Sequence, residues 1–170
     1  MNELLHLLTE PLQEGLKNQI LERFRALQLE DPFRDVFDLL RDTLQDFPEL
    51  ERYPQGWPPG WWLEPNLSRW WLCLSVDWKA SEEVAWQIQA ISRTLELTGG
   101  YSNLSGEPVL EQTQVLDALK HASHWLRWRD CHLVLLESGG DDYMAVIVPH
   151  PRLEAVRDAF KRLGVNSSLV

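Results

Sequence analysis

The chain has 170 residues, 44% of them hydrophobic and 25% charged, and its formal net charge is −10 at pH 7. These totals suit a soluble globular chain with a core of ordinary size, folded as one domain or as one domain with a helical extension. Because an acidic surface repels phosphate groups, they also disfavour nucleic-acid binding. A basic protein partner is electrostatically favoured, although net charge can also serve only to keep a protein soluble.

The acidity lies mainly in the N-terminal part of the chain. Residues 1–68 contain 13 acidic and 6 basic side chains, whereas residues 69–170 contain 13 and 10. The only cysteines, Cys73 and Cys131, are too few for a disulfide framework, so a reducing compartment is expected. No basic N-terminal region precedes an apolar run, and no stretch approaches the roughly 18 apolar residues of a membrane span. We therefore expect a cytoplasmic protein that does not enter a membrane.

Two or three amphipathic helices are expected in residues 2–47 of the N-terminal segment 1–47. The first covers residues 2–9, the second follows Pro11, and the third follows Asp31-Pro32, a frequent helix start. The third helix is expected to bury one apolar stripe, Phe33, Val36, Phe37, Leu40 and Leu44. Its opposite face is expected to meet solvent through Arg34, Asp38, Arg41, Asp42 and Gln45. The helices must pack on each other or on the rest of the chain to bury their stripes.

Residues 48–68 are rich in proline and tryptophan. The five prolines of this segment are incompatible with regular secondary structure. Trp57, Trp61 and Trp62 each bury on the order of 150–250 Å² when packed, so we expect an ordered loop. Packing against the core is the favoured role of these tryptophans, and an exposed interaction surface is the alternative.

A strand followed by a helix is predicted at the centre of the fold, in residues 69–86. Apolar side chains occupy every second position of its first half, Trp70, Leu72, Leu74 and Val76. From Ser81, a suitable helix cap, the period changes to that of a helix that extends to about residue 97. One apolar row of this helix is expected to face the sheet, and a second row the N-terminal helices.

The remaining chain predicts a helix near residues 115–128, a hairpin of residues 132–137 and 143–148, a helix at 153–163 and a closing edge strand at 165–170. The fold class is α+β, with an antiparallel or mixed sheet of three to four strands in the ferredoxin-like split βαβ order. We expect the helices to cover one face of this sheet. The N-terminal segment 1–47, the loop 48–68 and the core 69–170 are expected to form one structural domain.

Four carboxylates are the main candidates for chemistry. Asp77 follows the first strand, Glu137 ends the second, and Asp141 and Asp142 open the third. In a split βαβ sheet these strand ends lie at one edge, where crowded carboxylates bind a divalent cation or supply a general acid. The favoured alternative is a solvated hairpin turn, with Asp77 capping the helix that follows it.

The other candidate residues give weaker signals. His121, His124, Cys131 and His132 are zinc-ligand types that lie close together in the sequence. Their spacing lacks the Glu of a metalloprotease helix, and adjacent strand residues point to opposite faces, so surface histidines are the favoured interpretation. No serine-nucleophile motif and no complete phosphate-binding glycine loop occurs. A non-enzymatic role is therefore favoured, and no cofactor is predicted.

Two segments resemble a known family. The run Val76-Asp77-Trp78-Lys79 and the hairpin Gly140-Asp141-Asp142-Tyr143, with Val148-Pro149 after it, are similar to an uncharacterised bacterial family of domains of unknown function. Members share a strand that ends in Asp-Trp-Lys and a Gly-Asp-x-Tyr hairpin. The resemblance covers about residues 70–165 and implies a small cytoplasmic bacterial domain with no assigned catalytic residue. The proline- and tryptophan-rich loop departs from the family's pattern.

Two functional hypotheses follow. The first is a non-enzymatic protein-binding module, for example an immunity or antitoxin-like protein whose acidic surface blocks a basic toxin. The second is a divalent-metal-binding domain or metal-dependent enzyme that uses Asp77, Asp141 and Asp142. Thermal melts with added metal ions distinguish the two, because an ion that binds only the native state raises the melting temperature.

Overall fold

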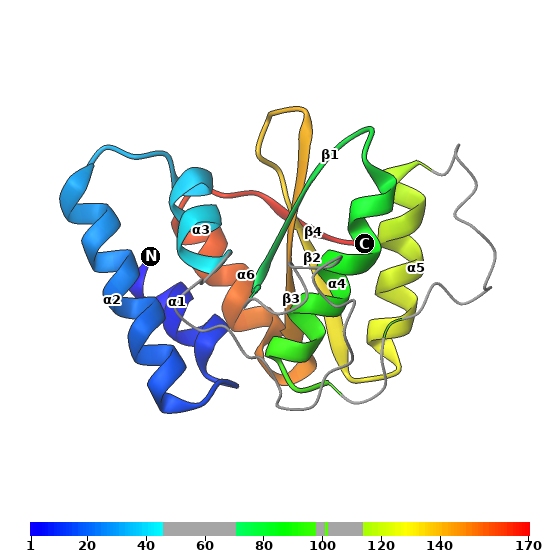
Figure 1. The fold of residues 1–170 in the computed structure, drawn as a ribbon, viewed down its shortest axis with the longest axis horizontal. Helices are drawn as coiled ribbons and strands as arrows, with labels where there is room; N and C mark the ends of the chain where they lie inside the picture. Colours follow the sequence, from blue (N-terminus) through cyan, green and yellow to red (C-terminus); the bar gives the residue numbers. More distant parts are fainter. Residues whose placement is uncertain (46–70, 98–100, 102–113) are drawn as a thin grey trace, which may run out of the picture.

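Four antiparallel strands form a sheet in the part of the chain that the structure describes (Figure 1). The structure, a computed structural model, describes residues 1–45, 71–97, 101 and 114–170. In these residues the strands are β1 (Cys73–Asp77), β2 (Cys131–Leu136), β3 (Asp142–Pro149) and β4 (Ser167–Leu169), in the order β1-β3-β2-β4. The predicted α+β class and the hairpin of β2 and β3 are confirmed.

The ferredoxin-like strand order is not confirmed. Strand β3 lies between β1 and β2, as in a split βαβ unit. A ferredoxin-like sheet would place β4 beside β1, whereas β4 pairs with β2, with Leu169 opposite Val134. The outer edge of β1 is already occupied, because the Gln87 side chain binds the backbone of Ser75 on that side. The closing strand therefore pairs at the other edge of the sheet.

Helices cover both faces of the sheet, in three layers (Figure 1). The α-helices of the described ranges are α1 (Asn2–Thr9), α2 (Glu14–Glu30), α3 (Val36–Leu44), α4 (Ser81–Thr94), α5 (Val115–Arg127) and α6 (Leu153–Arg162), with a short 3-10 turn, η4 (His150–Arg152), before α6. Helices α1, α2, α3 and α6 lie on one side of the sheet, and α4 and α5 lie on the other. The expectation of helices on one face is wrong.

Alternate strand residues explain the two helical layers. Val134 and Val146 belong to the core on the side of α1–α3 and α6, whereas Leu74, Leu133 and Ile147 belong to the core on the side of α4 and α5. A strand that is apolar on both faces must be covered on both faces. The second row of α4 therefore cannot meet the N-terminal helices as expected.

The N-terminal helices share a core with the sheet and with α6. Leu5, Ile20, Phe24 and Leu40 are buried in the same cluster as Phe160 of α6. Because α1 and α2 bury their apolar stripes there, this segment packs on the sheet layer. None of the described helices is long and apolar enough to cross a membrane.

Helix α3 begins later than the Asp31-Pro32 signal predicts. Its N-cap is Asp35, whose carboxylate accepts a hydrogen bond of 2.8 Å from the backbone N–H of Phe37. Asp31 instead forms a turn, in which its carboxylate accepts from the N–H of Phe33 at 3.1 Å. Phe33 thus precedes the helix and lies outside its buried stripe. Likewise Ser81 is the first residue of α4 and provides no side-chain cap, since Ala80 holds the cap position.

Candidate functional site

The end of β1 and the start of β3 bring two of the candidate carboxylates together. Asp77 and Asp142 are directly opposite each other across the two strands. The backbone N–H of Trp78 donates to the carbonyl of Asp141 at 3.1 Å and extends this pairing by one residue. Glu137 follows β2, and its N–H donates to the carbonyl of Asn166 at 3.0 Å. The hairpin turn and the β1–α4 connection therefore lie together at one end of the strands, at the top of Figure 1.

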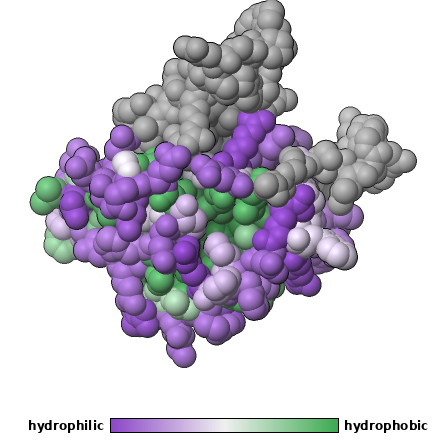
Figure 2. Space-filling model, turned by 90° about the horizontal axis from the view of Figure 1, so that it is seen from below, coloured by the Kyte–Doolittle hydropathy of each residue, from purple (hydrophilic) through white to green (hydrophobic). Residues whose placement is uncertain are grey.

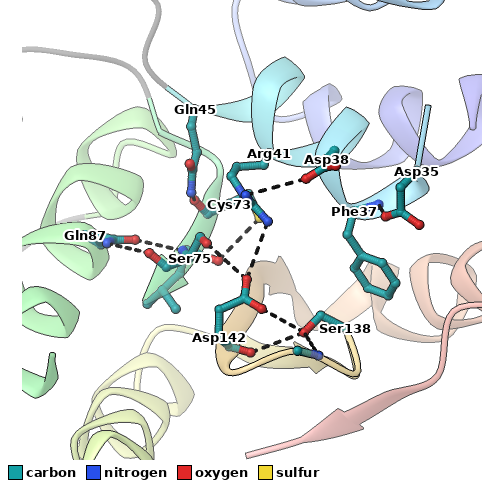
Figure 3. Close-up of polar contacts among 12 residues, drawn as sticks. Asp35, Phe37, Asp38, Arg41, Gln45, Cys73, Ser75, Gln87, Ser138 and Asp142 are labelled. Carbon is teal, nitrogen blue, oxygen red and sulfur yellow. Dashed lines mark hydrogen bonds and ion pairs between the residues drawn. The ribbon is translucent and has the colours of Figure 1, made fainter. Parts of the chain in front are cut away.

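Asp142 is bound by side chains from three different elements (Figure 3). The Ser138 hydroxyl donates to its Oδ1 at 3.0 Å, and the Ser75 hydroxyl lies 3.5 Å from its Oδ2. The guanidinium of Arg41, on α3, lies 3.6 Å from the same Oδ2 and 3.6 Å from the carboxylate of Asp38. These contacts tie the hairpin turn to β1 and to the N-terminal helices.

Arg41 and Gln45 do not form the solvent face that the sequence predicts. Arg41 reaches Asp142, and the Gln45 amide donates to the carbonyl of Cys73 at 2.7 Å. Both side chains therefore reach from α3 to the neighbouring strands. Arg34, in the turn before α3, forms an ion pair with Asp42 of that helix.

A buried glutamine binds the outer edge of β1. The Gln87 side chain is 2% exposed, and its amide oxygen accepts from the N–H of Ser75 at 2.9 Å. Its amide nitrogen donates to the carbonyl of the same residue, also at 2.9 Å (Figure 3). An amide can satisfy one donor and one acceptor in this way, as a neighbouring strand would. The contact pairs the outward-facing groups of Ser75, although none of the described strands lies beside this edge of β1.

The four candidate carboxylates do not make a metal centre in the described ranges. The Asp77 carboxylate accepts from the N–H of Lys79 at 2.9 Å, a turn contact in front of α4. Asp142 carries the ion pair with Arg41, and Glu137 and Asp141 are exposed. Among the residues that the structure describes, no three His, Cys, Asp or Glu side chains are arranged to hold a metal ion. The arrangement connects elements of the fold through charge-assisted hydrogen bonds.

The four zinc-ligand types of the sequence are also separated. His124 accepts a hydrogen bond of 3.3 Å from the Trp128 indole, and Cys131 is buried. His132 Nε2 instead lies 2.9 Å from Nδ1 of His150, a residue that sequence reasoning did not select. In the sequence, His150 is 18 residues from His132 and is marked only by its place directly after the strand β3.

Both thiols are buried, and burial raises their pKa values. Cys73, the first residue of β1, is buried in the core. The loss of hydration raises the pKa of its thiol to about 12, although Arg41 opposes the shift. Burial also raises the pKa of Cys131, and Asp130 contributes to this shift. Thiols that stay protonated are poor nucleophiles, so neither cysteine provides a reactive group.

We expect both thiols of the native chain to resist a thiol-specific reagent. With a pKa of about 12, roughly one Cys73 side chain in 10⁴ is ionised at pH 8, and burial further limits access. Ellman's reagent should therefore react slowly in buffer and with two thiols per chain in guanidinium chloride. Rapid labelling of Cys73 under conditions in which circular dichroism shows the chain to be folded would contradict the buried position.

The pKa of His132 is lowered from its usual value. Burial is the largest cause of the lowered pKa, His150 and Arg127 add to it, and Asp130 opposes it.

The lowered pKa of His132 makes the stability of the fold depend on pH. Around pH 6.5, the ordinary pKa of histidine, His132 binds more protons in the unfolded chain than in the folded chain. Neutral His132 therefore contributes to stability above about pH 6.5, and this contribution is lost as the pH falls. The free energy of unfolding in urea should decline more steeply on acidification in the native sequence than in His132→Asn. Equal slopes would show that His132 does not titrate differently on folding.

The tryptophans proposed as an interaction surface, Trp57, Trp61 and Trp62, lie outside the described residues. Other large apolar side chains are exposed, and sequence reasoning did not select them. Phe33, in the connection between α2 and α3, is 94% exposed, and Leu29, in the last turn of α2, is 84% exposed. Phe33 had been assigned to the buried stripe of α3. The turn at Asp31 and the later start of the helix place it in solvent.

The comparisons with known proteins agree with the family that the sequence resembles. The family model described as "Domain of unknown function (DUF6630)" matches residues 1–169. The match extends over the N-terminal helices and the proline- and tryptophan-rich segment, beyond the residues 70–165 that carried the resemblance. The searches of the curated proteins and of the solved structures found no significant match.

Proposed function

We infer that this chain, which belongs to the DUF6630 family of domains of unknown function, is a protein-binding module for a basic partner. One observation carries the inference. Two large apolar side chains, Leu29 and Phe33, are almost fully exposed in a short segment that has three acidic residues and one basic residue. We call residues 29–35 the acidic corner.

The acidic corner combines the two features of a recognition surface. Leu29 and Phe33 are separated in the chain by Glu30, Asp31 and Pro32, and Arg34 and the acidic Asp35 follow. These three acidic residues are exposed. Aromatic side chains are enriched at the centres of protein interfaces, where they fill a pocket of the partner. The surrounding carboxylates favour a partner with Lys and Arg around that pocket.

The backbone of the acidic corner is held in place before a partner binds. The N–H of Asp31 donates to the carbonyl of Leu27 at 3.1 Å, and the Asp31 carboxylate accepts from the N–H of Phe33 at 3.1 Å. The N–H of Arg34 then donates to the carbonyl of Asp31 at 3.3 Å. A loop that is already ordered loses less conformational entropy on binding, which favours affinity.

Outside the acidic corner, the exposed large apolar side chains of the described residues are Trp78, Trp128 and Leu169. Figure 2 shows one side of the molecule, with hydrophobic groups at its centre and at the left end, the end that α2 occupies in Figure 1. The other candidate residues also favour binding over catalysis, because the Asp142 carboxylate is paired with Arg41 and both cysteine thiols are buried. An immunity or antitoxin-like role in the bacterial cytoplasm, in which the acidic corner blocks a basic toxin, is the finer form of this proposal.

The test compares the full chain with two variants. The double variant Leu29→Ser/Phe33→Ser removes the apolar groups of the acidic corner. The matched control Trp128→Ser removes an exposed aromatic side chain, 79% exposed, at the end of α5 on the other side of the sheet. Each protein is immobilised and exposed to an extract of the cells that make it, and the proteins retained are identified and purified.

We expect the native chain and Trp128→Ser to retain the same basic protein. The double variant should bind it at least about tenfold more weakly, a loss of about 1.4 kcal/mol, and salt should weaken the complex. Equal binding by the double variant, or an acidic partner whose affinity does not depend on salt, would overturn the proposal.

A further inference from the structure

Two imidazole rings meet at the end of the sheet opposite the hairpin turn. His132 Nε2 and His150 Nδ1 are 2.9 Å apart, and the ring centroids are separated by 5.1 Å with an interplanar angle of 38°. His132 is the second residue of β2, and His150 directly follows β3. This pair lies outside the acidic corner, and its role is independent of the proposed partner binding.

The backbone holds both histidines in a fixed relation. Strands β2 and β3 are paired up to Cys131 and Pro149, the neighbours of the two histidines. The N–H of His150 then donates to the carbonyl of Asp130 at 2.7 Å and closes the end of the ladder. Only rotations of the two side chains are therefore needed to redirect their nitrogen lone pairs.

We propose that His132 and His150 form a two-nitrogen chelating site for a late first-row divalent metal ion, of the Cu²⁺ or Ni²⁺ class. Imidazole nitrogens bind such ions at about 2.0–2.1 Å, so two nitrogens that share one ion lie about 3 Å apart. The two nitrogens already contact each other at 2.9 Å, so rotation of the rings can turn both lone pairs toward one ion while the backbone stays in place. Within the late first-row series, Cu²⁺ has the highest affinity for nitrogen ligands and binds more tightly than Zn²⁺.

The surroundings leave room for further ligands. His150 is exposed and His132 is partly exposed, so water can complete the coordination of the ion. The charged side chains that act on His132 are Arg127 and Asp130, which have opposite signs, so the surroundings are not purely acidic. Arg127 is also bound to the carbonyl of Val170 at 2.9 Å. The site thus takes an ion by nitrogen coordination rather than by net negative charge.

The test uses the full chain after removal of metals with EDTA. Ni²⁺ binding is measured by isothermal titration calorimetry, and Cu²⁺ coordination by electron paramagnetic resonance near neutral pH. The variants are His132→Asn and His150→Asn, and the matched control is the double variant His121→Asn/His124→Asn, whose histidines lie three residues apart on α5. Circular dichroism without metal verifies that each variant is folded, and His150→Asn changes an exposed side chain outside the strands.

We expect one ion per chain, with hyperfine coupling to two equatorial nitrogens in the Cu²⁺ spectrum. Each single variant should weaken Ni²⁺ binding by at least about tenfold, since even the outer partners of metal ligands contribute about 10- to 100-fold. The control should bind as the native chain does. No binding of either ion, unchanged binding by His150→Asn, or loss of binding in the control would overturn the proposal and leave the pair as a hydrogen bond only.

Discussion

Replacing Phe160 with alanine should lower the free energy of unfolding by about 3–5 kcal/mol. The ring of Phe160 is fully buried between α6, the sheet and the N-terminal helices, so its removal leaves a cavity in the core that contains Leu5, Ile20 and Phe24. A domain is typically stable by only about 5–15 kcal/mol, so this is a large share of the total. The measurement is urea unfolding followed by far-UV circular dichroism and tryptophan fluorescence.

The matched control for this prediction is Phe33→Ala. The same atoms are removed from a side chain that is 94% exposed, so the free energy of unfolding should change by no more than about 0.5 kcal/mol. If the N-terminal helices and the sheet form one structural domain, the two probes should also report one coincident transition in the native chain. A similar loss of stability in both variants would contradict the placement of Phe33 in solvent.

Gln87→Leu is the second substitution with a large expected effect, about 2–4 kcal/mol. Leucine preserves the apolar stem but leaves the N–H and the carbonyl of Ser75 without their partner, and each unpaired group costs about 1–3 kcal/mol. It also exposes an unpaired strand edge, so the variant should aggregate more readily on heating. Chemical unfolding and light scattering measure the two effects.

Gln89→Leu provides the control, because Gln89 is on the same helix and only partly buried. We expect a change within about 0.5 kcal/mol and no increase in aggregation. Equal stability of Gln87→Leu and Gln89→Leu would indicate that the edge of β1 does not depend on the glutamine amide.

Periodicity predicted the elements of this fold more reliably than their arrangement. The apolar row of α5, Val115, Leu119, Ala122 and Leu126, is buried as its spacing indicates, and the glycine-rich hairpin turn contains Gly139 with a φ of +75°. The burial of an apolar helix row does not indicate which face of the sheet the helix packs on, however. The three layers follow only from the strands, which are apolar on both faces.

The polar contacts were hidden from sequence reasoning for a physical reason. Arg41 and Gln87 lie at helix positions where a polar side chain can meet either solvent or a strand edge, and the two cases have the same periodicity. Their partners, Asp142 and Ser75, are distant in the chain. Asp77 and Asp142 were expected at one edge because strand ends are set by topology, and the structure places them opposite each other.

Phe33 shows how a small error at a helix start changes a functional interpretation. The Asp31-Pro32 signal assigned this ring to the buried stripe of α3, but the cap at Asp35 leaves it in solvent beside the acidic residues. The acidic composition of the N-terminal part was visible from the sequence. The exposed aromatic side chain that would anchor a partner there was not.

Site-specific crosslinking at the acidic corner tests the proposed function most directly. The photoreactive residue p-benzoylphenylalanine is incorporated at position 33 of the full chain, or at position 128 as the control, in the cells that make the protein. Partner binding through the acidic corner predicts a discrete adduct with one basic protein from position 33, absent when Glu30 and Asp31 are replaced by lysine. No adduct from position 33, or the same adduct from position 128, would contradict it.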